Sequence, residues 1–183
     1  MRIFLLTVLS FAMSTPVVPQ SSRPCAKSRV DGCDDSCRAF HTVLDARSQL
    51  FRSIRGAKID ENETGEKRWQ AKVIVAAFSR GVCEVAELPA PVQGMERYGG
   101  YSCQLPRAAR DSAIKQFRPV LVSLQTALPK QWHTELFEND DEKTPIFRAG
   151  PSSDELYVFL GYVSDDRGYS LTFQASSMPI PTD

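Results

Sequence analysis

An almost unbroken apolar segment at the N-terminus, residues 3–13, constrains where this chain folds and therefore what becomes of its cysteines. Met1 and Arg2 precede the segment, and only Thr7 and Ser10 interrupt it. A basic start followed by an apolar stretch of this length is typical of a secretory signal peptide. The stretch is too short to cross a bilayer, which takes about 20 apolar residues. We therefore expect a secreted or periplasmic protein without a stable membrane anchor.

Small residues mark the expected cleavage site of this signal peptide. Ala12 and Ser14 have the spacing that a signal peptidase reads, so residues 1–14 are expected to be removed, and Ser22 marks a later alternative. Residues 15–24 are rich in Pro, Ser and Val without periodicity and are expected to form a flexible leader.

Five cysteines follow the expected cleavage site: Cys25, Cys33, Cys37, Cys83 and Cys103. In an oxidising compartment such residues are more often bridged than reactive. Cys83 and Cys103 lie in two strand-like segments, so we expect a hairpin to bring them into one disulfide. The other three lie close together in the sequence, and we expect a second bridge from Cys25 to Cys33 or Cys37. One thiol is then left over.

The charge of the chain is balanced. Lys and Arg number 22, as do Asp and Glu, so the net charge is zero. A nucleic-acid-binding protein needs a basic surface that displaces counterions, and we therefore expect no nucleic-acid partner. The length of 183 residues and the hydrophobic content of 42% are those of a single globular domain. We place that domain at residues 25–175 and a tail at residues 176–183.

The first half of the domain is predicted to be a helix followed by three strands. Asp34 or Asp35 caps an amphipathic helix that we expect to continue to about Arg55, with Gly56 as its stop. A polar surface loop is predicted next. Alternating or strand-like patterns then predict three strands, at residues 69–78, 83–88 and 98–105.

The second half is predicted to be a helix followed by four strands. Pro106 and Asp111 introduce a helix whose apolar residues recur at i, i+3 and i+4, and which ends at Leu128. Strands are then predicted at residues 132–137, 146–148, 156–163 and 169–174, and Gly168 is expected to supply a positive φ in the last hairpin. The predicted fold class is a single disulfide-stabilised α+β domain of order α-βββ-α-ββββ, with a mainly antiparallel sheet and both helices on one face.

A metal site is one alternative function. Cys33, Cys37 and His41 follow one another at four-residue steps, which places three ligand types on one stripe of a helix. No fourth ligand is evident, and an oxidising compartment favours bridged cysteines over ligands. We therefore expect no cofactor, and keep a metal or redox protein built on these residues as an alternative.

Catalysis by a hydroxyl nucleophile is the other alternative that the sequence leaves open. Such catalysis usually requires a histidine base, and the chain has only His41 and His133. Neither a Gly-x-Ser-x-Gly elbow nor a His-Glu-x-x-His pair occurs. We assign no catalytic residues, and an extracytoplasmic hydrolase with an unrecognised site remains a second alternative.

Aromatic residues in the predicted strands suggest a binding surface. The candidates are Trp132, Tyr157, Phe159 and Tyr169, and alternation along the strand places Tyr157 and Phe159 on one face. If both helices cover the opposite face, these rings are exposed and available to a ligand. A second small core beneath long loops is the alternative. On balance the sequence predicts an exported binding or interaction protein, not an enzyme, for an unknown protein or small ligand.

Export of the full chain in a host with a secretory system is the first prediction. Mass spectrometry of the purified protein should find an N-terminus at Thr15, and Leu6→Glu, which interrupts the apolar segment, should keep Met1 and remain in the cytoplasm. Recovery of wild-type protein that retains Met1 and carries only reduced cysteines contradicts the prediction.

Overall fold

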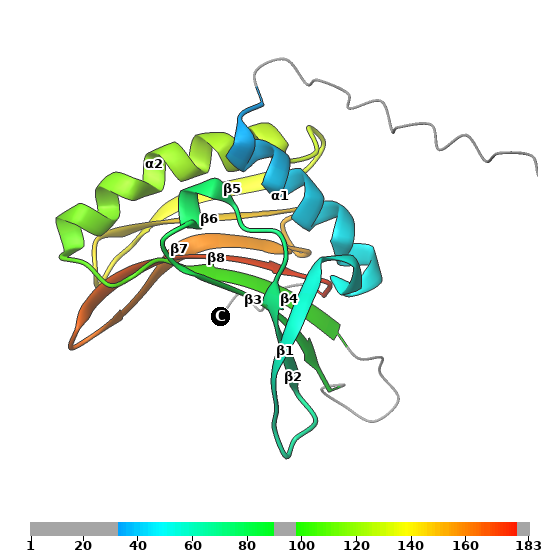
Figure 1. Ribbon diagram of the computed structural model, residues 1–183. Coiled ribbons are helices and arrows are strands. Elements are labelled where there is room, and N and C mark those ends of the chain that lie inside the picture. The colour runs from blue at the N-terminus through cyan, green and yellow to red at the C-terminus, as the bar shows by residue number, and fades with distance from the viewer. Residues whose placement is uncertain (1–32, 90–97, 179–183) are drawn as a thin grey trace, which may run out of the picture.

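The computed structural model describes residues 33–89 and 98–178 (Figure 1). The expected signal peptide, the leader and Cys25 lie outside these residues. Helix α1 spans Asp35–Ala46 and helix α2 spans Arg110–Ala127. The strands are β1 Arg55–Glu61, β2 Lys67–Ala71, β3 Val82–Leu88, β4 Tyr98–Gln104, β5 His133–Asn139, β6 Thr144–Gly150, β7 Val158–Asp165 and β8 Gly168–Ser176.

One antiparallel sheet contains all eight strands, in the order β1-β2-β3-β4-β8-β7-β6-β5. Each helix precedes a four-stranded meander, and the last strands of the two meanders, β4 and β8, pair in the middle of the sheet. Both helices cover the same face (Figure 1). The predicted α+β class, the layout of a helix followed by a run of strands in each half, and the placement of both helices on one face are therefore confirmed.

The core lies between the helices and the sheet, and its centre is aromatic. Phe173 of β8 packs edge to face against Phe40 of α1, with ring centroids 4.8 Å apart. The ring of Tyr101 on β4 lies 6.0 Å from Phe173, and the ring of Phe78 lies 6.4 Å from it. All four rings are almost completely buried. Aromatic pairs at such separations contribute beyond the area that they bury.

Helix α1 ends earlier than the predicted boundary near Arg55. It stops at Ala46, and two short 3-10 turns, Arg47–Gln49 and Arg52–Ile54, continue the chain to β1. The break falls at Leu50 and Phe51, which both adopt left-handed backbone conformations. Phe51 and Ile54 remain buried because the 3-10 turns still direct them inward. The apolar spacing that predicted a longer helix therefore does mark buried residues, but 3-10 turns and not an α-helix bury them.

The predicted strand at residues 69–78 is also shorter in the structure. Strand β2 ends at Ala71, and a 3-10 turn at Ala76–Phe78 follows. Val75 and Phe78 are both completely buried, a three-residue spacing that a strand does not allow. The sheet also contains one strand that the sequence did not predict, β1, whose last five residues are all exposed. An edge strand that is wet on both faces shows no alternation of apolar and polar residues.

Two disulfides join four of the cysteines. Cys83 and Cys103 lie directly opposite each other on β3 and β4, with Cα atoms 4.1 Å apart, so the predicted hairpin bridge is present. Cys33 bonds to Cys37, with Cα atoms 5.3 Å apart. The expected bridge from Cys25 to one of these two was wrong, because the first turn of α1 already brings Cys33 and Cys37 together.

The two bridges should differ in their effect on stability. Their sequence separations are 20 and 4 residues, and the chain-entropy model assigns about 3 kcal/mol to the longer loop and about 2 kcal/mol to the shorter one. We expect the double variant Cys83→Ala/Cys103→Ala to lose more free energy of unfolding in urea titrations than Cys33→Ala/Cys37→Ala. A larger loss in the second variant refutes this ranking.

Candidate functional sites

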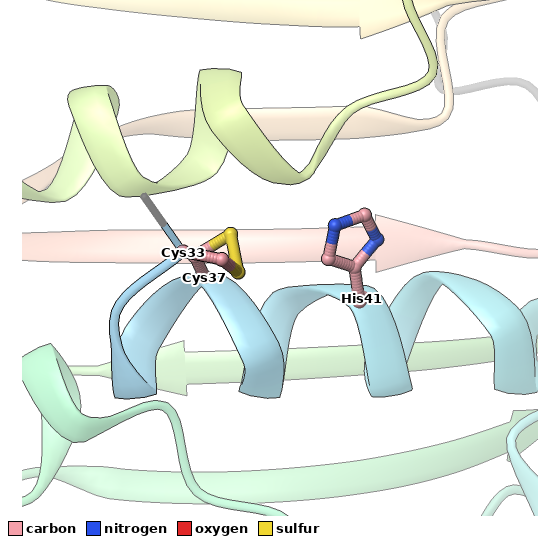
Figure 2. A group of neighbouring side chains, drawn as sticks. All are labelled: Cys33, Cys37 and His41. Atoms are coloured by element: carbon pink, nitrogen blue, oxygen red, sulfur yellow. A yellow bond between two sulfur atoms is a disulfide. The ribbon is translucent and has the colours of Figure 1, made fainter. Parts of the chain in front are cut away.

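Cys33, Cys37 and His41 form a cluster at the start of α1 (Figure 2). One ligand atom from each side chain lies within 4.8 Å of the other two. Residues four apart on a helix lie one above the other, which is why the imidazole of His41 sits one turn along from the disulfide. Cys37 is 1% exposed and packs into the core, whereas Cys33 and His41 are half-buried.

Hydrogen bonds fix the start of this helix. The carboxylate of Asp34 accepts from the backbone N–H of Cys37 at 2.7 Å and from the hydroxyl of Ser123 on α2 at 2.8 Å. These two bonds hold the pKa of Asp34 below its ordinary value. The guanidinium of Arg38 donates to the carbonyl of Cys33 at 2.9 Å. The cluster therefore sits on a capped helix end that is also tied to α2.

In the bridged state neither sulfur of this cluster is a thiolate, so the cluster offers only the imidazole of His41 as a metal ligand. Two-electron reduction converts the two cysteines into thiols and makes three ligands available. The structure thus brings together all three residues of the sequence-predicted metal site, and joins two of them in a disulfide.

The face of the sheet that carries no helix is a second candidate. One row of directly paired residues crosses seven strands on this face: Gln70, Glu84, Ser102, Gln174, Phe159, Arg148 and Glu135. The neighbouring row on the helix-covered face contains Cys103, Phe173, Leu160 and Phe147, which are all completely buried. The central part of the helix-free face is therefore mostly amide, hydroxyl and charged.

An apolar patch lies on the helix-free face of β5, β6 and β7. We call it the β5–β7 patch and define it as Phe137, Ile146, Phe159, Val163 and Arg148. Phe137 is 40% exposed and Val163 is 42% exposed. The guanidinium of Arg148 lies 5.2 Å from the centre of the Phe137 ring. The Phe159 ring lies over Gly161, where any side chain would collide with it.

The other aromatic candidates lie elsewhere. Trp132 and Tyr157 have ring centroids 6.4 Å apart, and both face the guanidinium of Arg47, at 5.2 Å and 4.0 Å. Tyr157 precedes β7 and contacts the segment that follows α1, so it does not join Phe159 on the helix-free face. Tyr169 pairs with Ser164 at the far end of the β7–β8 hairpin. Of the four sequence-predicted binding residues, Phe159 alone belongs to the β5–β7 patch.

His133 sits at the start of edge strand β5. Its imidazole lies 3.1 Å from the carboxylate of Glu135, and both side chains are substantially exposed. Within the described residues no serine or threonine hydrogen-bonds to this imidazole.

Burial raises the pKa of Tyr101 and of Tyr162 far above the ordinary tyrosine value, so both hydroxyls stay protonated. They donate to backbone carbonyls of Val73 and Ala113.

Sequence reasoning did not find most of the β5–β7 patch. Alternation within the strands places Phe137 and Val163 on a defined face of each strand, but only the register shows that these strands are neighbours. The sequence did carry one indication of the patch. Large apolar residues occur in a predicted hairpin that is otherwise rich in acidic and polar residues.

Comparisons of the chain with protein-family models, with curated proteins and with solved structures find no match. Neither α1 nor α2 is long and apolar enough to cross a membrane.

The cap of α1 should make stability depend on pH. Because the pKa of Asp34 is lowered by folding, its ionised form stabilises the fold fully above its unfolded pKa, near 4, and this contribution disappears as the pH falls through the folded pKa. Asp34→Asn keeps a capping oxygen but does not titrate. Wild type should exceed Asp34→Asn in free energy of unfolding at about pH 7 and lose that advantage as the pH falls through the lowered, folded-state pKa of Asp34.

The control for this experiment is Asp35→Asn. Asp35 neighbours the cap, but its carboxylate hydrogen-bonds to exposed Arg38 and not to the backbone. If Asp35→Asn changes the acid dependence as much as Asp34→Asn does, the cap is not responsible.

Proposed function

We propose that this chain is an exported, non-enzymatic binding protein that holds a partner protein on the β5–β7 patch. The observation that carries the proposal is the placement of both helices on one face of the sheet (Figure 1). On the other face, Phe137 of β5 and Val163 of β7 are exposed, and Ile146 and Phe159 are half-buried. Contiguous exposed apolar residues on a soluble domain mark interaction surfaces.

The composition of the patch supports a protein partner. Aromatic residues and arginine are enriched in the centres of protein interfaces, and the β5–β7 patch combines two phenylalanines with Arg148. The guanidinium of Arg148 lies over Phe137, so the ring and the charge form one surface. Glu135, the cross-strand partner of Arg148 on the outermost strand, supplies a polar rim.

The two disulfides support the export part of the proposal. Disulfides persist in oxidising compartments and are rare in the cytosol. Cys83 and Cys103 are both buried between strands, which protects that bridge from external thiols.

Site-specific photo-crosslinking in the cells that produce the protein tests the proposal. A benzophenone amino acid in place of Val163 should give a discrete covalent adduct with a partner protein. Val122→benzophenone is the matched control, because Val122 is also an exposed valine, at 57%, but lies on α2 in the helix layer. The control position should give no adduct of the same mass.

The variant Phe137→Ser, made in the Val163 crosslinking background, should reduce the yield of adduct at least about tenfold, since a central aromatic residue commonly contributes more than 1.4 kcal/mol to an interface. Equal adducts from positions 163 and 122, or no adduct from position 163, contradict the proposal. Circular dichroism of the purified variants checks that each one folds.

A further inference from the structure

We propose that the reduced form of the Cys33, Cys37 and His41 cluster is a binding site for a thiophilic divalent cation, of which Zn²⁺ is the expected one. This inference goes beyond the binding role of the sheet and does not depend on it. Thiolate and imidazole are the ligands that zinc prefers in proteins, and three protein ligands leave a fourth tetrahedral position for solvent.

The cluster needs only a small adjustment to reach zinc geometry. Zinc–sulfur bonds of about 2.3 Å and zinc–nitrogen bonds of about 2.0–2.1 Å place the ligand atoms of a tetrahedral site about 3.4–3.8 Å apart. The three ligand atoms already lie within 4.8 Å of one another. Cys37 and His41 occupy successive turns of α1, whereas Cys33 precedes the cap and is not held by helical hydrogen bonds. Rotation of the Cys33 side chain can therefore open space between the sulfurs.

The imidazole of His41 is available to a ligand. Within residues 33–89 and 98–178 neither of its ring nitrogens has a hydrogen-bond partner, although the ring is half-buried beside the disulfide (Figure 2). The two ring nitrogens are not among the buried polar atoms that lack a partner, so both are open to solvent and to a ligand. A cation bound between this ring and the two sulfurs gives an imidazole nitrogen a partner.

The surroundings of the cluster favour a cation over an anion. Asp34 and Asp35 flank the first turn of α1, and the carboxylate of Asp34 is fixed by Cys37 and Ser123. Arg38, a cation of the first turn of α1, is occupied by Asp35 and by the carbonyl of Cys33. Two thiolates, a neutral imidazole and a divalent cation give a site without net charge, so the site adds no uncompensated charge to the partly buried helix end.

Formation of the site begins with thiol–disulfide exchange by an external dithiol. The dithiol transfers two electrons and two protons, becomes a cyclic disulfide, and leaves thiols at Cys33 and Cys37. Binding of the cation then releases these two protons. The Cys33–Cys37 bridge should react first, because Cys33 is half-buried while Cys83 and Cys103 are both buried, at 7% and 0% exposure.

Cobalt titration of the mature chain with Cys25→Ser tests the proposal, since that substitution removes the one cysteine outside both bridges. A dithiol is applied without denaturant and removed anaerobically, and alkylation with peptide mapping should find thiols at Cys33 and Cys37 only. Co²⁺ should then bind with one-to-one stoichiometry, give a thiolate-to-cobalt charge-transfer band, and be displaced by Zn²⁺. The unreduced protein should show no such band.

Histidine variants make the test specific. His41→Ala should weaken Co²⁺ binding at least about tenfold, because loss of a ligand costs no less than loss of an outer-shell partner. His133→Ala is the matched control, since it removes the other histidine, on β5, and should leave the affinity unchanged. Cys33→Ser should weaken the charge-transfer band, because it removes one of the two thiolates.

Three results overturn the proposal: no charge-transfer band in the reduced protein, equal losses of affinity in His41→Ala and His133→Ala, or reduction of the Cys83–Cys103 bridge before the Cys33–Cys37 bridge. Far-UV circular dichroism of each reduced variant checks folding, and His41→Gln replaces His41→Ala if the alanine variant unfolds.

Discussion

The packing of Phe173 against Phe40 is the contact on which the remaining structure depends. Phe173 lies on β8, one of the two central strands, and Phe40 lies on α1, so this pair sets the face of the sheet that the first helix covers. Tyr101 and Phe78 pack around the same ring and fix β4 and the turn before β3. Helix α2 then packs beside α1 on the same side. The opposite face of the sheet is left to interact with solvent or with a partner as a consequence of where this aromatic cluster is buried.

The elements that the sequence predicted well are those with one buried face and one solvent-exposed face. Strands β3 and β4 alternate between buried and more exposed residues along their length, and the buried residues of α2 recur at three- and four-residue steps, because the core lies on one side of each element. The end of α1 was misplaced because Phe51 and Ile54 keep a helix-like spacing in 3-10 turns. Strand β1 was missed because its exposed residues carry no pattern, and its pairing with β2 is set by the hairpin and by Arg55. The guanidinium of that residue lies over Trp69 and hydrogen-bonds to Glu87.

The candidate sites were predictable in part. A four-residue spacing was enough to bring Cys33, Cys37 and His41 together, since Cys37 and His41 lie on successive turns of α1 and Cys33 stands just before its cap. The spacing could not predict which cysteines form the disulfide, because three nearby cysteines allow several pairings. The aromatic surface depends on contacts distant in sequence. Trp132 and Tyr157 pack against the guanidinium of Arg47. The β5–β7 patch exists only because the register aligns Phe137, Ile146 and Phe159 on neighbouring strands.

The mirrored order of the sheet has a consequence for how the chain acquires its structure. Every strand pair but one joins strands that follow each other in the sequence, so each meander can form from local hairpins. The exception is the seam between β4 and β8, which pairs residues far apart in the chain and therefore carries the larger loop-closure cost. Cys103 sits on this seam opposite Phe173. Its bridge to Cys83 therefore constrains the β3–β4 hairpin on the same strand that joins the two meanders, so the disulfide and the seam share one structural element.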